Sequence, residues 1–308
     1  MSVRMFDELG NGKLKIAQPD DWYTGRYTDV VGRSLEKDAT LFILPEPARE
    51  AVEAALALGE PLLLTGDPGT GKTQLAYWLA VQLGWERPVR YQVQSGATAR
   101  DFRYEFDELG RFHEGKGVAK ERFLRPGALW QAMHLAQERR RPAVLLVDEI
   151  DKATRDFPND LLRDIEDVCF TVPELDGREI KLEDANLRPV VVITSNGERN
   201  LPAPFLRRCI CCHLVFDRNT LLQAVAARAA ELGPPTSEFI RLAIQRFERI
   251  RAVVPEPKPA TAEFLMWTRL LRKLQLEALV DTGPLAKTAG ASALVKTREG
   301  REALEKAG

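Results

Sequence analysis

The fold of this chain is decided by the stretch Pro61-Leu62-Leu63-Leu64-Thr65-Gly66-Asp67-Pro68-Gly69-Thr70-Gly71-Lys72-Thr73. Its apolar start predicts a buried strand, and its second half fits the phosphate-loop pattern G-x-x-x-x-G-K-[ST] at every fixed position. Glycines let the backbone curl so that several N–H groups point at one centre. The residues expected to bind the phosphates of a nucleotide are Gly66, Asp67, Pro68, Gly69, Thr70, Gly71, Lys72 and Thr73.

The residues after the loop favour a helix. Apolar side chains recur at helical spacing from Lys72 to Leu83, and Gly84 follows as a residue that ends helices. Strand, loop and helix in this order are the context that a phosphate loop requires. We therefore expect Lys72 to reach the β- and γ-phosphates and the Thr73 hydroxyl to hold Mg²⁺.

A second motif begins with the apolar run 144–147, which predicts a buried strand followed directly by Asp148 and Glu149. Ligands of open α/β sheets bind at the carboxyl ends of the strands. Asp148 is expected to act on Mg²⁺, mostly through water, and Glu149 to orient and activate an attacking water. An acidic turn after a core strand is the plain alternative, but it loses most of its weight once a phosphate loop precedes it.

Two further features follow along the chain. Asn196 closes the apolar run 190–193 and is expected at the same sheet edge, where it could bond the γ-phosphate or the water. Arg207 and Arg208 follow a short apolar helix, and an arginine fork stabilises charge on a transferring phosphoryl group. A turn-forming asparagine and a solvated basic pair are the competing interpretations.

The remaining pattern predicts an α/β domain with a parallel five-stranded sheet covered on both faces, followed by a small helical domain. We expect a lead-in segment over 1–40, the α/β core over 41–217 and a helical lid over 218–308. The core carries inserts at about 101–125 and at 169–182, the second being a hairpin turned at Asp176-Gly177. The expected strands cover 61–64, 89–93, 144–147, 190–193 and 211–216, and the expected helices cover 45–58, 72–83, 128–140, 158–168, 219–232, 237–250, 261–279 and 291–307.

Composition narrows the class of protein. The 308 residues hold 44 basic and 45 acidic side chains, a net charge of −1, which gives no electrostatic case for nucleic acid or an anionic membrane. No apolar run approaches the roughly 20 residues that span a bilayer, and the first residues lack a signal-peptide core. With four cysteines and no disulfide framework, a cytoplasmic protein with reduced thiols is expected. Cys211 and Cys212 should face opposite ways on a strand, which disfavours zinc.

The order of the motifs resembles the AAA+ ATPases, and within them the MoxR-like branch. The residues that carry the resemblance are Asp148-Glu149-Ile150-Asp151-Lys152-Ala153, Thr194-Ser195-Asn196, and Leu201-Pro202 with Phe205-Leu206-Arg207-Arg208-Cys209. It covers about residues 40–280. The resemblance implies the αβα sandwich of that class, with Lys72 and Thr73 in Walker A, Asp148 and Glu149 in Walker B, and Asn196 as sensor 1.

The resemblance also implies an assembly and a partner. The family forms rings, usually homo-hexamers, in which each ATP with its Mg²⁺ lies at a subunit interface. Arg208 aligns best with the arginine finger that reaches the neighbouring subunit, and Arg207 is the near alternative. Family members remodel protein clients in a chaperone-like way, often with von Willebrand A domain proteins, and their two inserts usually face the pore or the substrate.

One departure and two rival functions stay open. The sensor-2 arginine of the family is missing from Pro259-Ala260-Thr261-Ala262-Glu263, and Lys258 or Arg269 are its possible replacements. One rival is a nucleic-acid-associated AAA+ motor of the restriction or helicase-loader type, which could use GTP; the neutral charge weighs against it. The other is a nucleotide-gated scaffold in a bacterial conflict system, against which the intact Asp148-Glu149 pair argues.

Overall fold

The computed structural model describes residues 6–9, 13–16, 39–114 and 117–307. They divide into two compact units. One comprises Leu44–Gly66 and Lys72–Leu214, and the second comprises the remaining described residues. Each unit encloses a hydrophobic core of its own. The predicted division near residues 40 and 217 stays a prediction.

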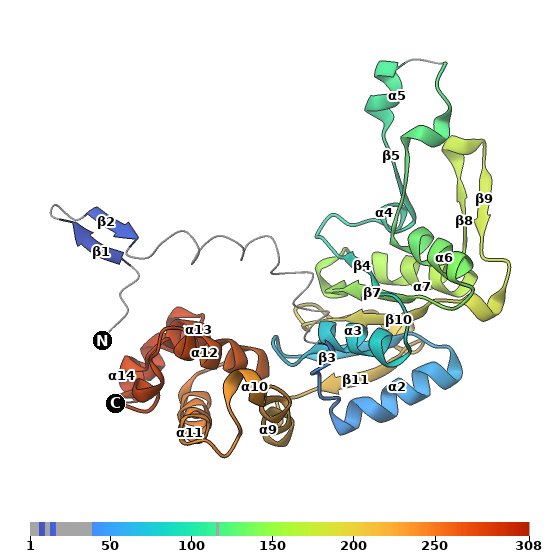
Figure 1. The fold of residues 1–308 in the computed structure, drawn as a ribbon. Coiled ribbons are helices and arrows are strands. Elements are labelled where there is room, and N and C mark those ends of the chain that lie inside the picture. The colour runs from blue at the N-terminus through green and yellow to red at the C-terminus, as the bar shows by residue number, and fades with distance from the viewer. Residues whose placement is uncertain (1–5, 10–12, 17–38, 115–116, 308) are drawn as a thin grey trace. The chain divides into compact units, whose positions relative to one another are not determined.

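The first unit is built on a five-stranded, all-parallel sheet in the order β11-β3-β10-β7-β4 (Figure 1). The predicted α/β fold with a parallel sheet is therefore confirmed. Because β10 lies between β3 and β7, the ends of the strands that precede the phosphate loop, the acidic pair and Asn196 lie side by side. The strands are β3 (Leu62–Gly66), β4 (Val89–Gln92), β7 (Val144–Asp148), β10 (Val190–Thr194) and β11 (Ile210–Leu214).

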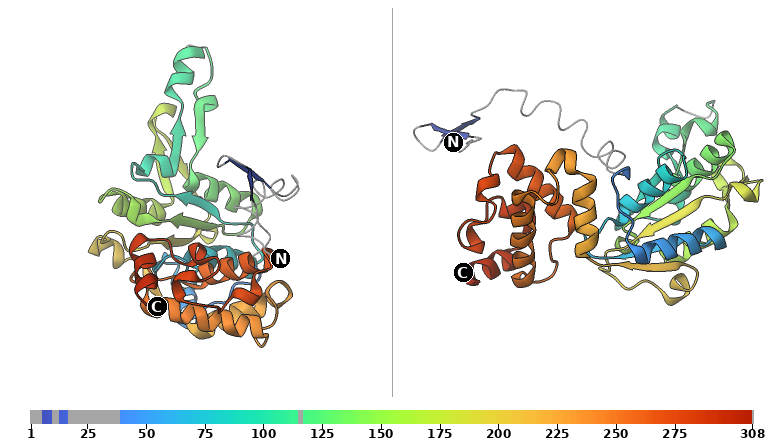
Figure 2. Two further views of the ribbon diagram at one scale, coloured as in Figure 1. Left: turned by 90° about the vertical axis from the view of Figure 1, so that its left-hand side faces the viewer. Right: turned by 60° about the horizontal axis from the view of Figure 1, so that its bottom comes forward.

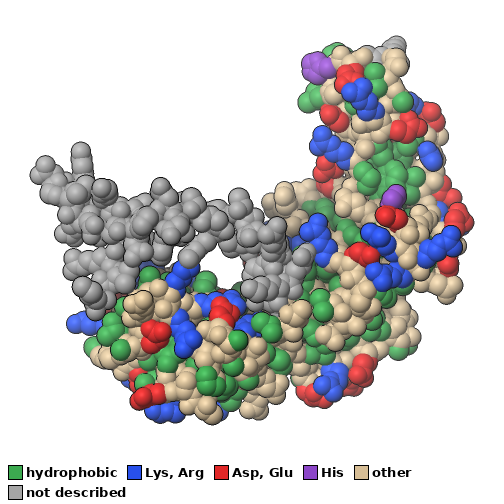
Figure 3. Space-filling view, in the orientation of Figure 1, with side chains coloured by type: hydrophobic (Ala, Val, Ile, Leu, Met, Phe, Trp, Pro, Cys, Tyr) green, Lys and Arg blue, Asp and Glu red, His purple; other side chains and the backbone are tan. Residues whose placement is uncertain are grey.

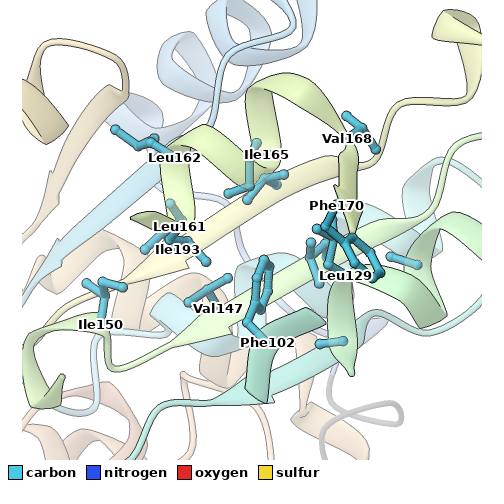
Figure 4. Packing of buried hydrophobic residues seen from close by; sticks show 14 of the residues in the cluster. Phe102, Leu129, Val147, Ile150, Leu161, Leu162, Ile165, Val168, Phe170 and Ile193 are labelled. Atoms are coloured by element: carbon cyan, nitrogen blue, oxygen red, sulfur yellow. The ribbon is translucent and has the colours of Figure 1, made fainter. Parts of the chain in front are cut away.

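Helices cover both faces of this sheet (Figure 2). Successive residues of a strand point to opposite faces, and in β7 Leu145, Leu146 and Val147 are all fully buried, so neither face is open to water. On one face, Leu161 and Ile165 of α7 point toward the strands that carry Val147 and Ile193 (Figure 4). The helices of this unit are α2 (Glu46–Leu58), α3 (Lys72–Gln82), α4 (Ala99–Arg103), α5 (Glu108–Glu114), α6 (Ala128–Arg139), α7 (Phe157–Asp167) and α8 (Ala203–Leu206).

The two predicted inserts are ordered and joined to each other. In the first, β5 (Tyr104–Phe106) pairs antiparallel with β6 (Leu124–Pro126), and α5 and the 3₁₀ helix η2 (Lys120–Phe123) lie between them. In the second, β8 (Cys169–Val172) pairs with β9 (Arg178–Lys181) through η4 (Pro173–Leu175). Glu174 of the second insert accepts hydrogen bonds from Arg100 at 2.5 Å and from the Tyr104 hydroxyl at 2.8 Å.

The tip of the first insert is exposed. Leu109 and Phe112 of α5 are 74% and 84% exposed, whereas Phe102 at its base is fully buried. Charged side chains of both signs and hydrophobic ones are mixed on this part of the surface (Figure 3). Below the tip, Arg103 donates to both carboxylate oxygens of Asp164 on α7 at 2.6 Å, which ties the insert to the sheet-covering helix.

The second unit is helical around Phe247, Phe264 and Trp267, whose rings pack edge to face. A fully buried arginine, Arg246, bonds the Thr288 hydroxyl at 2.9 Å and the carbonyls of Gly283 and Pro284 at 3.0 and 2.5 Å. The helices are α9 (Arg218–Ala227), α10 (Ala229–Leu232), α11 (Glu238–Val253), α12 (Thr261–Lys273), α13 (Ala291–Leu294) and α14 (Arg298–Lys306), with η6 (Glu277–Leu279) and η7 (Leu285–Lys287) between α12 and α13.

Three predicted helices of this unit are wrong in extent. The predicted helix 219–232 breaks at Arg228, whose buried guanidinium bonds the Leu41 and Ala224 carbonyls. The helix predicted over 261–279 ends at Lys273, soon followed by Gln275 with a left-handed φ of 54°. The helix predicted over 291–307 is interrupted before Thr297, whose hydroxyl caps α14 by accepting from the Gly300 N–H.

The segment over 1–40, predicted as a lead-in, contains one pair of strands. Residues Phe6–Leu9 and Lys13–Ile16 form β1 and β2, an antiparallel pair, while most of the segment lies outside the described residues. Among the helices of the described part of the chain, none has the length and apolar character needed to cross a membrane.

Candidate functional site

The phosphate loop joins the end of β3 to the start of α3. Gly66, Gly69 and Gly71 all have positive φ values, of 129°, 79° and 96°. A Cβ on Gly66 would lie 2.0 Å from the Leu214 carbonyl oxygen, so this position requires glycine. Lys72 is buried, and its Nζ donates to the Gly66 carbonyl at 2.6 Å. The loop thus holds its lysine folded back over the turn.

Asp148 is the most heavily engaged carboxylate at the site. It ends β7 and is buried, and its Oδ1 accepts hydrogen bonds from the hydroxyls of Thr73 at 2.9 Å and Thr194 at 2.6 Å. Its Oδ2 accepts from Arg90 of β4, from Nε at 3.1 Å and from Nη2 at 2.5 Å. The two residues predicted to hold Mg²⁺, Thr73 and Asp148, are therefore in direct contact.

Glu149 lies beyond the strand end in a strained conformation, with φ at 62° and ψ at 52°. Its N–H donates to the Thr194 hydroxyl at 2.9 Å. Its Oε2 accepts from Gln92 Nε2 and from Lys152 Nζ, the latter at 2.6 Å, and this bond raises the pKa of Lys152. The side chain lies partly exposed at the carboxyl end of the sheet, where a water could approach it.

Asn196 follows β10 and comes close to Glu149. Its Nδ2 lies 3.4 Å from Glu149 Oε1, a long hydrogen bond. The backbone around it is fixed by Asp151, whose buried Oδ2 accepts from the N–H groups of Asn196 at 3.1 Å and Glu198 at 2.9 Å. Thr73, Asp148, Glu149 and Asn196 thus lie close together at the carboxyl edge of the sheet, and Lys72 lies at the end of β3.

Arg207 and Arg208 lie elsewhere in this unit. Both follow α8 and are exposed. Arg208 Nη1 pairs with Glu166 of α7 at 3.0 Å, and the two side chains are about half exposed. A pair of this kind contributes about 0–1 kcal/mol, so it can be released at little cost.

The donor set suits Mg²⁺, an ion that prefers oxygen ligands. A hydroxyl and a carboxylate, Thr73 Oγ1 and Asp148 Oδ1, lie 2.9 Å from each other. Among the described residues there is no cluster of three or more His, Cys, Asp or Glu side chains that could hold a metal alone. A magnesium ion here would take its other ligands from water and from nucleotide phosphates.

Two other predicted features have simple surroundings. Cys212 is buried and Cys211 exposed, so the two thiols face opposite sides of β11 as expected. Arg269, one candidate for the missing sensor-2 arginine, pairs with Glu231 at 2.7 Å. Its role and that of Lys258 stay predictions.

Sequence reasoning missed Arg90, Gln92 and Thr194. Arg90 and Gln92 alternate with Val89 and Tyr91 on β4, and that alternation places both polar side chains on one face of a strand. The strand was predicted, but its place beside β7 was not, and that neighbour brings both side chains to the acidic pair.

The comparisons with known proteins agree with this geometry. Residues 61–209 match the family model described as AAA domain (dynein-related subfamily). Curated relatives include an uncharacterised protein, YehL, of Escherichia coli (strain K12), 24% identical over 242 residues, which are 72% of this chain and 62% of that protein. Another is cell division protein C of Sulfolobus acidocaldarius, 26% identical over 204 residues, 65% of this chain and 49% of that protein. The chain thus spans about half to three fifths of the length of these relatives.

Among solved structures, a candidate ATPase from Cytophaga hutchinsonii is similar with a TM-score of 0.42 and 13% identity, covering 89% of this chain and 83% of that one. The parallel sheet, the phosphate loop after β3 and the match over residues 61–209 together show that this part of the chain has the α/β P-loop fold of the AAA+ ATPases.

Proposed function

We propose that this chain is an ATPase that binds ATP with Mg²⁺ and hydrolyses it to ADP and phosphate. The observation that supports this most is the 2.9 Å contact between Thr73, at the start of α3, and Asp148, at the end of β7, with Glu149 directly after Asp148. A nucleotide-gated scaffold would have no need for Glu149 in a strained turn at this edge, since strain of this kind concentrates at functional sites.

In this proposal each residue has one task. The loop N–H groups and Lys72 bind the phosphates, and Thr73 and Asp148 hold Mg²⁺, which neutralises charge on the transferring phosphoryl group. Glu149 orients the attacking water and accepts its proton. Asn196, held by Asp151 through its backbone N–H, keeps the carboxylate and the water in line.

We propose further that hydrolysis needs a neighbouring subunit. Arg208 pairs with exposed Glu166 rather than with the acidic pair of its own chain. A MoxR-like ring, in which Arg208 or else Arg207 reaches the next subunit, would use a surface arginine of this kind. Because arginine fingers contribute roughly 10³–10⁵ in turnover, a lone subunit would be nearly inactive.

The resemblance extends the proposal to a protein client, remodelled at the expense of ATP. The joined inserts, with Leu109 and Phe112 exposed at the tip, are the part of the described surface that we assign to client contact. A von Willebrand A domain protein is the first candidate, because MoxR-like ATPases commonly work with such proteins.

Phosphate release from ATP tests the proposal. We expect Glu149→Gln to lose about 10²–10⁴ in turnover, since a water-activating group is removed, while the binding of a fluorescent ATP analogue persists. Lys72→Ala should lose binding as well. Glu53→Gln, an exposed position on α2, is the matched control and should behave as wild type. If Glu149→Gln turns over like that control, the proposed catalytic role is wrong; a purified candidate client that leaves turnover unchanged would count against the client.

A further inference from the structure

The acidic residue expected to hold the metal already has a cation bound to it. Asp148 is 3% exposed, and burial of a carboxylate without a compensating charge is costly. The hydroxyls of Thr73 and Thr194 donate to Asp148 Oδ1 but carry no charge. The compensating positive charge comes from Arg90, which donates from Nε and Nη2 to Asp148 Oδ2. Arg90 therefore supplies the counter-charge of Asp148 in this structure.

The position of Arg90 allows its guanidinium to move away from Asp148. It lies on β4, an outer strand of the sheet, and its side chain is 32% exposed. Its Nη2 also donates to Gln92 Oε1, so the guanidinium keeps a partner when it moves off the carboxylate. Asp148, at the end of the inner strand β7, has no such freedom.

The next step rests on the proposed function. A divalent ion held by Thr73 and Asp148 would lie close to the Arg90 guanidinium, because both cations contact the same carboxylate. Two positive charges this close together repel each other strongly in a partly buried site. A single buried carboxylate then serves two cations, which compete for it. We propose that Arg90 is the counter-ion of Asp148 in the metal-free site and gives up this place when Mg²⁺ arrives with the nucleotide. Arg90 thereby raises the metal concentration that is needed to fill the site.

Metal affinity tests this directly. Mn²⁺, whose free form is counted by electron paramagnetic resonance, is titrated into the protein in the presence of the ATP analogue AMP-PNP. In Arg90→Gln the Mn²⁺ dissociation constant should fall about tenfold or more, a change equal to about 1.4 kcal/mol. Arg90→Lys keeps the charge and should stay within a few-fold of wild type. Thermal melts without metal should show Arg90→Gln to be less stable than wild type, with the loss recovered by Mn²⁺ and AMP-PNP.

A measurement on the wild-type protein covers the case in which Arg90→Gln does not fold. Phenylglyoxal, which modifies arginine, is applied with AMP-PNP present in both arms, one with EDTA and one with Mg²⁺, and Arg90 is followed by peptide mapping. The proposal expects faster modification with Mg²⁺. An unchanged or weaker Mn²⁺ affinity in Arg90→Gln, or equal labelling in both arms, overturns the role of Arg90. Failure of the wild type to bind AMP-PNP or Mn²⁺ would instead remove the proposed function.

Discussion

At the residue scale, the position of Glu149 is bound up with a single hydroxyl. A glutamate with φ near 62° holds a conformation that costs on the order of 1–3 kcal/mol outside glycine. Thr194 accepts from the Glu149 N–H and donates to Asp148, so one side chain fixes both members of the acidic pair. The arrangement turns the end of β10 into the support for the end of β7.

Removing that hydroxyl gives a sharp prediction. Thr194→Val keeps the shape of the side chain but removes its hydroxyl. The Glu149 N–H then lacks its acceptor and Asp148 Oδ1 lacks one of its donors, which should lower the free energy of unfolding by about 1–3 kcal/mol. Phosphate release should fall as well, because the turn that aims Glu149 is loosened. Thr171→Val, at an exposed position of β8, serves as control. Urea unfolding and turnover are the two measurements, and equal behaviour of both variants would show that Thr194 supports nothing at the site.

The site residues that sequence could predict are those fixed by local spacing. Lys72 and Thr73 follow from one loop, and Asp148 and Glu149 from one strand end. Arg90 could not be found in this way, because its contact with Asp148 depends on which strand lies beside β7, and strand order is a property of the whole sheet.

At the element scale, the predictions that hold are those in which a long apolar period meets a clear end signal. The strand β7 and the helices α3 and α6 are of this kind. The breaks within the helical unit were missed because they come from tertiary contacts. The chain leaves the helix at Arg228, whose guanidinium bonds a carbonyl nearly two hundred residues away, at Leu41. Periodicity carries no record of such a bond.

The start of α9 gives a prediction for pH. Asp217 caps the helix by accepting from the N–H and hydroxyl of Thr220, and the backbone bond is the main reason that the pKa of Asp217 is lowered. Because the pKa of Asp217 is lower in the folded state, the ionised carboxylate stabilises the folded state fully above its unfolded pKa of about 3.9. This stabilisation is lost as the pH falls through the folded pKa. Asp217→Ala should therefore cost about 1 kcal/mol at pH 7 and less below pH 4.

Thermal melts followed by circular dichroism between pH 7 and pH 3 measure the difference. Asp217→Asn retains a capping oxygen that does not titrate, so its stability relative to the alanine variant should change little over this range. A gap between wild type and Asp217→Ala that stays constant down to pH 3 would contradict the charged cap.

At the scale of the whole molecule, the fold class followed from the alternation of apolar strands with helices, and five parallel strands were found where five were predicted. The assembly of subunits could not be predicted in the same way, since a subunit interface hardly changes the hydrophobic periodicity of a single strand or helix. Arg208 is the residue through which the fold of one subunit would affect the assembly. Its weak surface pair with Glu166 leaves it available to a neighbour, as the proposed ring requires.

Mixing inactive subunits tests that link. Glu149→Gln loses the water-activating carboxylate but keeps Arg208, while Arg208→Ala loses the arginine but keeps Glu149. If Arg208 acts in the neighbour's site, a mixture of the two should recover roughly a quarter of wild-type turnover, because head-to-tail contacts of random composition pair the two intact halves about one time in four. A mixture of Lys72→Ala with Glu149→Gln should stay inactive, since no site in it has both Lys72 and Glu149. Phosphate release is measured after mixing at several protein concentrations. If the first mixture is as inactive as its components, or if Arg208→Ala alone turns over normally, Arg208 does not act across a subunit interface.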